Sequence, residues 1–324
     1  MISYFIAGAM WALWLTFIVV RRRRTRHTVT WSAFTIAVSM TLNLDPVFIR
    51  VDKALGGNNW ADLIGNGTLM IGLFLLARGV TYAHPFRSRY GKIALGFPAL
   101  LAAMAVTTTA FLFINRGATT TAFMAELGTQ PAAAAYSITQ YVYFALVISA
   151  LGISCLHEVT RTTGGARIAV ILILTGTVLG LATCVLIVAM DIVHLVGDEP
   201  LLSALQIVYD PMYAGTIGLL CAGLALGPIV RAVSNARRWG TTARLVRELR
   251  PAWEAAVELR PSLTRLGALG MNTRSAEETL YRQVVEIRDV AGQSSGAYQL
   301  TPSDESLLEA AEAHLLVKSA PSLA

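Results

Sequence analysis

The chain has 324 residues, of which 55% are hydrophobic and 14% are charged, and its mean hydropathy is +0.57. Soluble domains carry about 25% charged residues, so this composition excludes a wholly water-soluble protein. Residues 1–228 carry 23 charged side chains, and residues 229–324 carry the same number over less than half that length. We therefore expect a membrane-embedded domain over 1–228 and a soluble segment after it.

Long apolar segments recur along the first 228 residues. A transmembrane helix needs about 20 mostly apolar residues. The segments of suitable length are residues 2–20, 28–48, 61–82, 92–114, 132–156, 167–190 and 203–228. Arg21–Arg24 follow the first segment, whereas a signal peptide carries its basic residues before the apolar run, so we expect this segment to be retained. The sequence predicts an all-α, multi-pass membrane bundle of seven transmembrane helices.

Basic residues are distributed unequally between the loops that join these segments. Loops 21–27, 83–91 and 157–166, with their immediate edges, carry eleven Lys and Arg residues, whereas the alternate loops carry three. Short cytoplasmic loops are enriched in Lys and Arg. We therefore expect the N-terminus outside, the C-terminus inside, and a location in the cell inner (plasma) membrane.

Polar residues of the expected helices gather near their outer ends. Asp62 and Asn66 are four residues apart and therefore share one helix face, and ionisable groups in membrane segments are often functional. We expect an outward-facing pocket for a cation, an amine or another polar ligand. Its residues would be Asp45, Asp62, Asn66, Asp191, His194, Tyr209 and Asp210. The alternative is that each marks the water interface, while Asn66 and Gln140 lie deep enough for interhelical hydrogen bonds.

Signatures of common membrane enzymes and photoreceptors are missing from the sequence. Residues 203–228 contain no lysine, which excludes a retinal Schiff base in the last segment. Only His194 lies on the expected outer side, which excludes an outer zinc site with three histidine ligands. We expect no enzyme activity, cofactor or metal, and the one enzymatic alternative is an outer-leaflet metal-dependent hydrolase with mixed His and Asp ligands.

Two pairs of glycines occur at four-residue spacing in the last two apolar segments. Gly176 and Gly180 form one pair, and Gly223 and Gly227 form the other. Small residues at this spacing allow helices to approach closely. We expect packing within the bundle, and a homodimer through these faces is the alternative.

Residues 229–250 form a basic segment directly after the last apolar segment. They carry six arginines against one acidic residue. Anionic lipid headgroups attract basic residues next to a membrane, so we expect headgroup contacts and no nucleic acid partner. The arginines expected to contact headgroups are Arg231, Arg237, Arg238 and Arg244.

Residues 251–324 are predicted to form a cytosolic helical domain. Ser275 and Glu278 match a capping box, which begins a helix over about 276–291. Apolar residues at helical spacing give this helix one continuous face. We expect a cytosolic protein partner to bind at Leu280, Tyr281, Val284, Ile287 and Arg288.

Two stretches carry a resemblance to a known family. The first runs from Thr41 through Pro46 and on to Ile64, and the second combines Leu249–Trp253 with Leu280–Asp289. Together they resemble an actinobacterial family of multi-span membrane proteins that are labelled transporters and whose cytosolic tail is a domain of unknown function. The resemblance implies a membrane location and a helical tail, and it supplies no functional residues.

Two functions of different class follow from these features. The first is a receptor-like sensor, in which a ligand in the outer pocket alters the cytosolic helices. The alternative is a transporter of an ion or small molecule, in which the same acidic residues begin a polar path. Few ionisable groups lie in the middle of the expected helices, and this favours the sensor.

Overall fold

The computed structural model describes residues 2–19, 27–81, 89–259, 275–293 and 299–319. All regular secondary structure in these ranges is helical, which confirms the all-α class. The chain divides into two compact units, Met1–Val230 and Arg231–Ala324. We call them the membrane unit and the C-terminal unit and describe each by itself.

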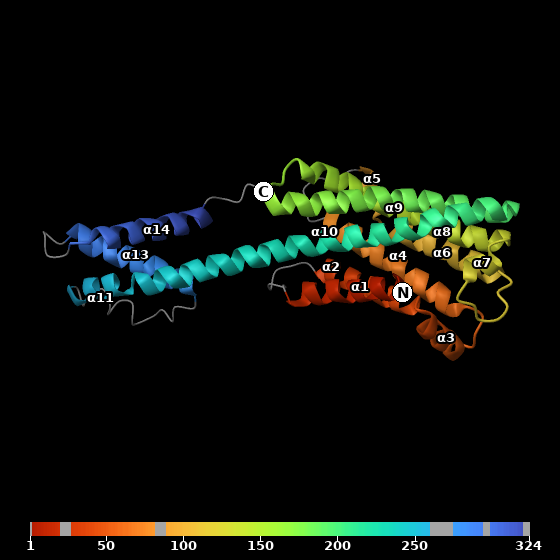
Figure 1. The fold of residues 1–324 in the computed structure, drawn as a ribbon, viewed down its shortest axis with the longest axis horizontal. Coiled ribbons are helices and arrows are strands. Elements are labelled where there is room, and N and C mark those ends of the chain that lie inside the picture. The colour runs from red at the N-terminus through yellow and green to blue at the C-terminus, as the bar shows by residue number, and fades with distance from the viewer. Residues whose placement is uncertain (1, 20–26, 82–88, 260–274, 294–298, 320–324) are drawn as a thin grey trace. The chain divides into compact units, whose positions relative to one another are not determined.

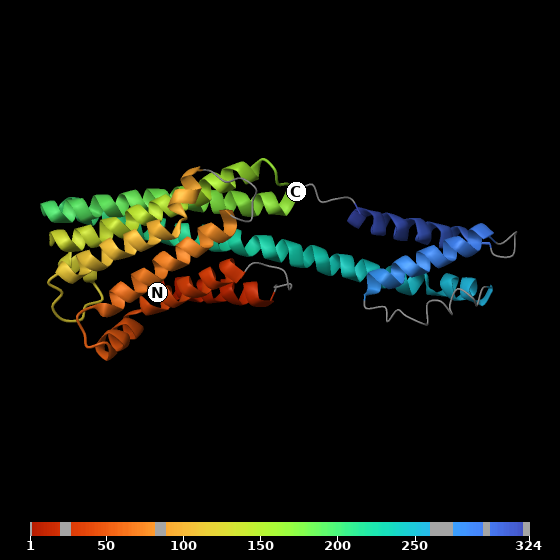
Figure 2. The same cartoon turned by 180° about the vertical axis from the view of Figure 1, so that it is seen from behind.

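The membrane unit consists of long apolar helices joined by short ones (Figure 1). In chain order these are α1 (Ile2–Val19), α2 (His27–Leu42), α3 (Asp45–Ala54), α4 (Trp60–Thr81), α5 (Arg89–Ala94), α6 (Phe97–Phe113), α7 (Phe123–Leu127), α8 (Pro131–Val159), α9 (Gly164–Val196) and α10 (Glu199–Glu248). Helix α2 packs between α1 and α4, and α8 packs against α4, α6 and α9 (Figure 2). Helix α10 contacts α9 on one side and residues of α1 on the other.

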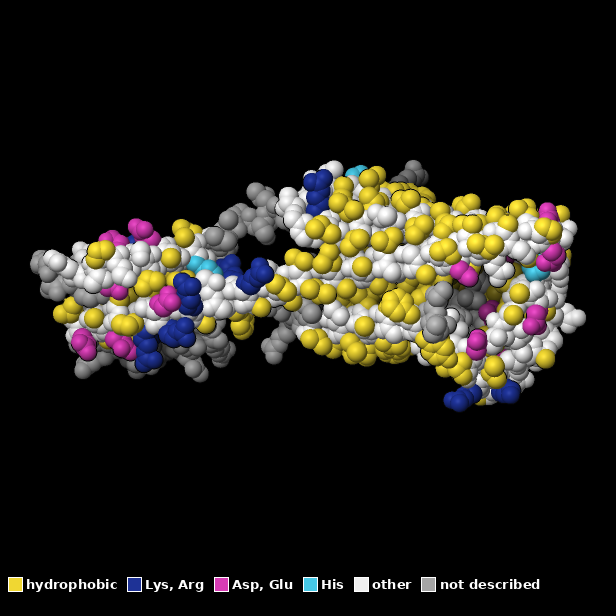
Figure 3. Space-filling model, viewed as in Figure 1, with side chains coloured by type: hydrophobic (Ala, Val, Ile, Leu, Met, Phe, Trp, Pro, Cys, Tyr) yellow, Lys and Arg dark blue, Asp and Glu magenta, His cyan; other side chains and the backbone are white. Residues whose placement is uncertain are grey.

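The exposed surface of the membrane unit is strongly apolar. Phe113, Val196 and Ile207 are each more than three-quarters exposed. Figure 3 shows hydrophobic side chains over α9 and α10, with acidic side chains concentrated at the end that holds α3 and α7. Exposed apolar surface of this extent, together with several long apolar helices, indicates a membrane protein.

Fewer helices than the seven predicted are both long enough and apolar enough to cross a membrane. Within the described residues, α4, α8, α9 and α10 are long and apolar enough to cross a membrane, and the bent pair α2 and α3 raises the number to five. Helices α1 and α6 are apolar but shorter. The basic segment Arg21–Arg24 lies outside the described residues.

The predicted second span ends earlier than expected. Helix α2 stops at Leu42, and the chain turns by 88° into α3. Pro46 lies in the first turn of α3, and proline is well suited to a helix start because its missing N–H would be unpaired there. Residues 45–48 therefore belong to a separate short helix, so the helix predicted over 28–48 is broken after Leu42.

A buried carboxylate closes the connection from α3 to α4. Asp52 is fully buried and accepts hydrogen bonds from the backbone N–H of Asn59 (3.0 Å) and of Ala61 (3.1 Å), and from the Thr119 hydroxyl (2.6 Å). Asn58 and Asn59 have positive φ angles, a conformation that asparagine tolerates better than most residues. Asp52 thereby fixes the first turn of α4.

Close packing of α9 against α10 depends on three of the paired glycines. A Cβ added to Gly223 would lie 2.6 Å from Cγ1 of Ile173, and Gly176 and Gly180 face Leu220 and Thr216 in the same way. These glycine faces are occupied within the chain. This agrees with the expected packing within the bundle for these three residues, and a homodimer stays a prediction.

The C-terminal unit contains the end of α10 together with α11 (Arg250–Leu259), α13 (Ala276–Gln293) and α14 (Pro302–Ser319). Its buried core is formed by Leu245, Leu249, Ala252, Ala256, Leu280, Val284, Ile287, Val290, Leu308 and Ala311. Helix α13 begins one residue after Ser275, whose hydroxyl accepts the N–H of Glu278 at 3.2 Å. The predicted N-cap of this helix is confirmed.

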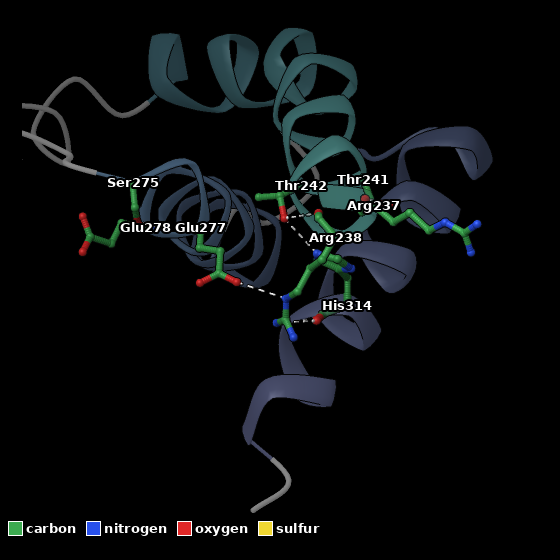
Figure 4. A network of polar contacts seen from close by, with 8 residues as sticks. All are labelled: Arg237, Arg238, Thr241, Thr242, Ser275, Glu277, Glu278 and His314. Carbon is green, nitrogen blue, oxygen red and sulfur yellow. Dashed lines mark hydrogen bonds and ion pairs between the residues drawn. The ribbon is translucent and has the colours of Figure 1, made fainter. Parts of the chain in front are cut away.

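A polar network joins three helices of the C-terminal unit (Figure 4). The Arg238 guanidinium forms an ion pair with Glu277 of α13 at 3.1 Å. It also donates to the backbone oxygen of His314 on α14 at 3.5 Å. The Thr242 hydroxyl lies 2.9 Å from Nε2 of His314. These contacts fix the orientation of α10, α13 and α14 around the apolar core.

Candidate functional site

A central cavity of about 380 Å³ lies inside the membrane unit. Residues of α1, α2, α4, α8, α9 and α10 line it. Along α4 the lining begins at Asp62 and continues through Asn66 to Leu76, about four helical turns. The volume falls in the range of small-molecule sites, about 300–1,000 Å³.

Three polar side chains form a hydrogen-bonded cluster on the cavity wall. The Tyr136 hydroxyl donates to Oδ2 of Asp62 at 2.6 Å. The Asn66 amide donates to the same carboxylate oxygen at 3.1 Å and to the Tyr136 hydroxyl at 3.0 Å. Helix α4 contributes Asp62 and Asn66 from adjacent turns, and α8 contributes Tyr136. The cluster therefore orients one carboxylate at a cavity whose lining is mostly apolar.

A second polar group lies one turn further along α8. Gln140 is 2% exposed and lines the cavity, and its Nε2 has no hydrogen-bond partner among the described residues. A buried polar group without a partner is costly, and such groups in folded proteins call for an explanation. Gln140 thus presents an unused donor at the cavity.

The rest of the wall is mostly apolar and aromatic. Beyond Asn66, α4 presents Leu69, Leu73 and Leu76 to the cavity. Helices α1, α8 and α10 contribute aromatic side chains to the lining, including Phe17, Tyr141, Phe144, Tyr209 and Tyr213. The arrangement suits a ligand with one polar end and an apolar body.

A second hollow of about 700 Å³ adjoins the cavity. Four residues line both spaces, namely Met40, Asn43, Tyr209 and Tyr213. Asp210 lines the second hollow but not the cavity. The rings of Tyr209 and Tyr213 stack with centroids 5.5 Å apart. These two tyrosines therefore lie at the boundary between the second hollow, which holds the exposed carboxylate of Asp210, and the cavity.

The predicted pocket residues separate into two groups in the structure. Asp62, Asn66 and Tyr209 line the cavity, and Asp210 lines the adjoining hollow. The other three predicted residues line neither space. Asp45 is exposed at the start of α3.

Asp191 and His194 point into packed regions of the protein. Asp191 is 5% exposed, and its Oδ2 has no partner among the described residues. The imidazole of His194 packs against Gly128, which follows α7. The prediction that one pocket gathers all seven residues is therefore wrong, because Asp45, Asp191 and His194 line neither the cavity nor the adjoining hollow.

Sequence reasoning overlooked Tyr136, the residue that ties the cluster together. Tyr136 and Gln140 are four residues apart and therefore share a face of the helix predicted over 132–156. Their spacing matches that of Asp62 and Asn66. Two such pairs on separate apolar helices are a signal that could have indicated this site.

The predicted partner-binding face of α13 is largely internal. Leu280, Val284 and Ile287 are at most 6% exposed and pack in the core of the C-terminal unit. The expectation that these three bind a partner is wrong, because α11 and α14 already cover them. Tyr281 is exposed, and Arg288 forms an ion pair with Glu312 at 2.8 Å. Hydrogen bonding to Glu312 raises the pKa of Arg288 above its ordinary value.

The arginines expected to contact lipid headgroups differ in their surroundings. Arg237 is exposed and points away from the polar network in Figure 4. Arg238 is already paired with Glu277, and Arg244 lies 3.2 Å from Glu248 while remaining 64% exposed. The side chain of Arg231 lies outside the described residues. Arg238 is therefore a structural residue of the C-terminal unit.

Metal-ligand geometry is missing from the described part of the chain. Within the described ranges, no group of three or more His, Cys, Asp and Glu side chains could hold a metal ion. The carboxylate at the cavity, Asp62, has hydroxyl and amide neighbours instead. The arrangement suits hydrogen bonding and charge pairing.

Comparison with known proteins gives one match, to the C-terminal unit. Residues 238–320 match a family described as a family of unknown function (DUF6545). The predicted C-terminal domain of unknown function agrees with this match. Searches of the curated proteins and of the solved structures give no match.

Proposed function

We propose that the protein is a receptor-like membrane sensor that binds a small molecule in the central cavity of the membrane unit. The observation that carries this proposal is the cavity itself. Its volume suits a small molecule, and its wall combines one oriented carboxylate with a mostly apolar lining. The C-terminal unit is the output domain. It carries the family match and has its own buried core.

The proposed location is the cell inner (plasma) membrane, which the chain crosses seven times. The N-terminus lies outside the cell, and the C-terminal unit lies in the cytosol. Helices α1 and α6 supply the two further spans. The apolar part of each is 17 residues long, at the lower limit of what crosses a bilayer, about 17–25 residues. The unequal distribution of Lys and Arg between the loops supports this orientation.

Helix α10 is the element through which a ligand would act. Tyr209, Tyr213 and Thr216 of this helix line the cavity, and Arg238 and Thr242 of the same helix belong to the polar network of the C-terminal unit. A ligand shifts a conformational equilibrium only if it binds one state better than the other. In this proposal, the ligand's contacts with α10 are better in one conformation of the protein than in the other, and this difference in affinity shifts the equilibrium.

A transporter is the second candidate. The length of the cavity along α4 favours it, since the lining extends over about four turns. Against transport of a polar cargo, Leu69, Leu73 and Leu76 leave the deeper part of this wall without a polar group. Binding without passage fits this lining better.

The test uses the full chain in lipid nanodiscs with 2-phenylethanol, a neutral probe with an apolar ring and one hydroxyl. We expect the probe to raise the unfolding temperature and to alter amide hydrogen exchange in α13. Leu73→Trp, which fills the cavity, should abolish both effects. Leu101→Trp is the control, because Leu101 is 62% exposed on α6 and lies outside the cavity lining.

Two results would contradict the proposal. An equal temperature shift in Leu73→Trp and in the wild type would place the probe outside the cavity. Binding with unchanged exchange in α13, together with faster uptake of the probe into proteoliposomes than into protein-free liposomes, would favour the transporter.

A further inference from the structure

The described lining of the cavity carries one acidic side chain without a basic side chain beside it. Among the described residues that line it, Asp62 is the one carboxylate, and none of them is Lys, Arg or His. A buried charge in an apolar environment is strongly disfavoured unless an opposite charge or several hydrogen bonds compensate it. The described lining supplies hydrogen bonds to this carboxylate but no cationic side chain.

The hydrogen bonds leave one carboxylate oxygen available. Oδ2 of Asp62 accepts both the Tyr136 hydroxyl and the Asn66 amide. Oδ1 receives no hydrogen bond from any described residue, although the side chain belongs to the cavity wall. The two neighbours hold the carboxylate in place, and the free oxygen is the natural acceptor for a donor on a ligand.

Gln140 provides an independent observation that a ligand with a polar end belongs here. Its amide nitrogen is buried at the cavity without a partner. Gln140 lies one turn from Tyr136 on the same face of α8. A ligand that fills the space beside Asp62 can place a hydrogen-bond acceptor on this donor as well.

The approach to the cavity also favours a cation. Asp210 is exposed in the second hollow, and the stacked rings of Tyr209 and Tyr213 stand between that hollow and the cavity. Aromatic faces attract cations through their electron-rich centre. A positively charged group moving inward would meet Asp210, then the tyrosines, then Asp62.

We infer that the cavity selects an amphiphilic organic amine, whose ammonium group pairs with Oδ1 of Asp62 and whose apolar body lies against the leucines of α4 and the aromatic side chains of the lining. This inference rests on the proposed function and adds the chemical class of the ligand. The polar end also carries or adjoins an acceptor for Gln140. Neutral and anionic molecules of the same shape bind less well.

The experiment compares three probes that share a phenyl ring and differ in charge: 2-phenylethylamine, 2-phenylethanol and 3-phenylpropanoate. Affinity for the full chain in nanodiscs is measured by titration calorimetry, with empty nanodiscs subtracted. We expect the amine to bind about tenfold or more tightly than the alcohol, because close charge pairs typically contribute at least a factor of ten. The carboxylate should bind least.

Variants separate the charge from the fold of the site. Asp62→Asn keeps an acceptor for Tyr136 and removes the charge, so it should lower the affinity for the amine to that for the alcohol. Tyr136→Phe keeps the charge and should retain the preference for the amine. Asp45→Asn removes an exposed carboxylate outside the cavity and should change neither affinity, and unfolding temperatures without probe report whether each variant folds.

The outcomes distinguish failure of the amine inference from failure of the proposed binding function. Equal affinities for amine and alcohol in the wild type would overturn the amine inference and leave the binding function intact. A preference for the amine that survives in folded Asp62→Asn would also overturn it. If none of the three probes binds the wild type, both the inference and the proposed binding function are wrong.

Discussion

The sharpest prediction concerns Asp52 and the end of the membrane unit that holds α3. Its carboxylate accepts two backbone N–H groups at the start of α4 and the Thr119 hydroxyl, and the side chain is fully buried. In Asp52→Asn one acceptor becomes an N–H donor that faces other donors. We expect the free energy of unfolding of the membrane unit to fall by about 2–4 kcal/mol, since a hydrogen bond to a charged group contributes about 1.5–3 kcal/mol.

The assay is reversible unfolding of the full chain in mixed micelles, followed by tryptophan fluorescence. Asp45→Asn is the matched control, because Asp45 is exposed in the same short helix α3, and we expect a change of less than about 0.5 kcal/mol for such a surface position. Equal stability of Asp52→Asn and the wild type would refute the assigned role of Asp52. A loss of similar size in Asp45→Asn would show that α3 responds to its total charge instead.

Two further predictions concern packing in the two units. Gly223→Ala should destabilise the membrane unit by about 1–3 kcal/mol, because its Cβ would lie 2.6 Å from Cγ1 of Ile173, whereas Gly218→Ala meets nothing within 4 Å and should have no such cost. Unfolding in mixed micelles compares the two, and equal losses would contradict the close approach. Ile287→Ala should lower the opening free energy of α13 amides by about 2–5 kcal/mol in hydrogen exchange. Tyr281→Ala, at a 62% exposed position of the same helix, should leave this opening free energy unchanged. An equal loss in Tyr281→Ala would mean that the exposed face of α13 contributes as much to its stability as the buried face.

The features predicted correctly from the sequence are those encoded locally. Apolar segments of helical length predicted an all-α membrane protein, and the Ser275 and Glu278 spacing predicted the start of α13. The end of α2 was predicted too late. A hydropathy pattern reports the polarity of residues 43–48 but not the 88° turn that removes them from the span.

The partner-binding face of α13 shows a second limit. Leu280, Val284 and Ile287 fall at helical spacing, so the sequence indicated an apolar face without indicating what covers it. In the structure, α11 and α14 cover that face. An amphipathic pattern is the same for a core helix and for a docking helix, and only the packing of neighbouring elements distinguishes them.

The sequence by itself determined the lipid environment, the helical class and the change in charge density after residue 228, because each depends on composition or on residues close together in the chain. Only the tertiary structure decided which polar side chains form a site. Tyr136 lies 74 residues from Asp62 and yet donates a hydrogen bond to it, whereas Asp191 and His194 turn into packed regions. The physical reason is that the rotation of each helix about its axis is set by packing against its neighbours, and this rotation decides which residues reach the cavity.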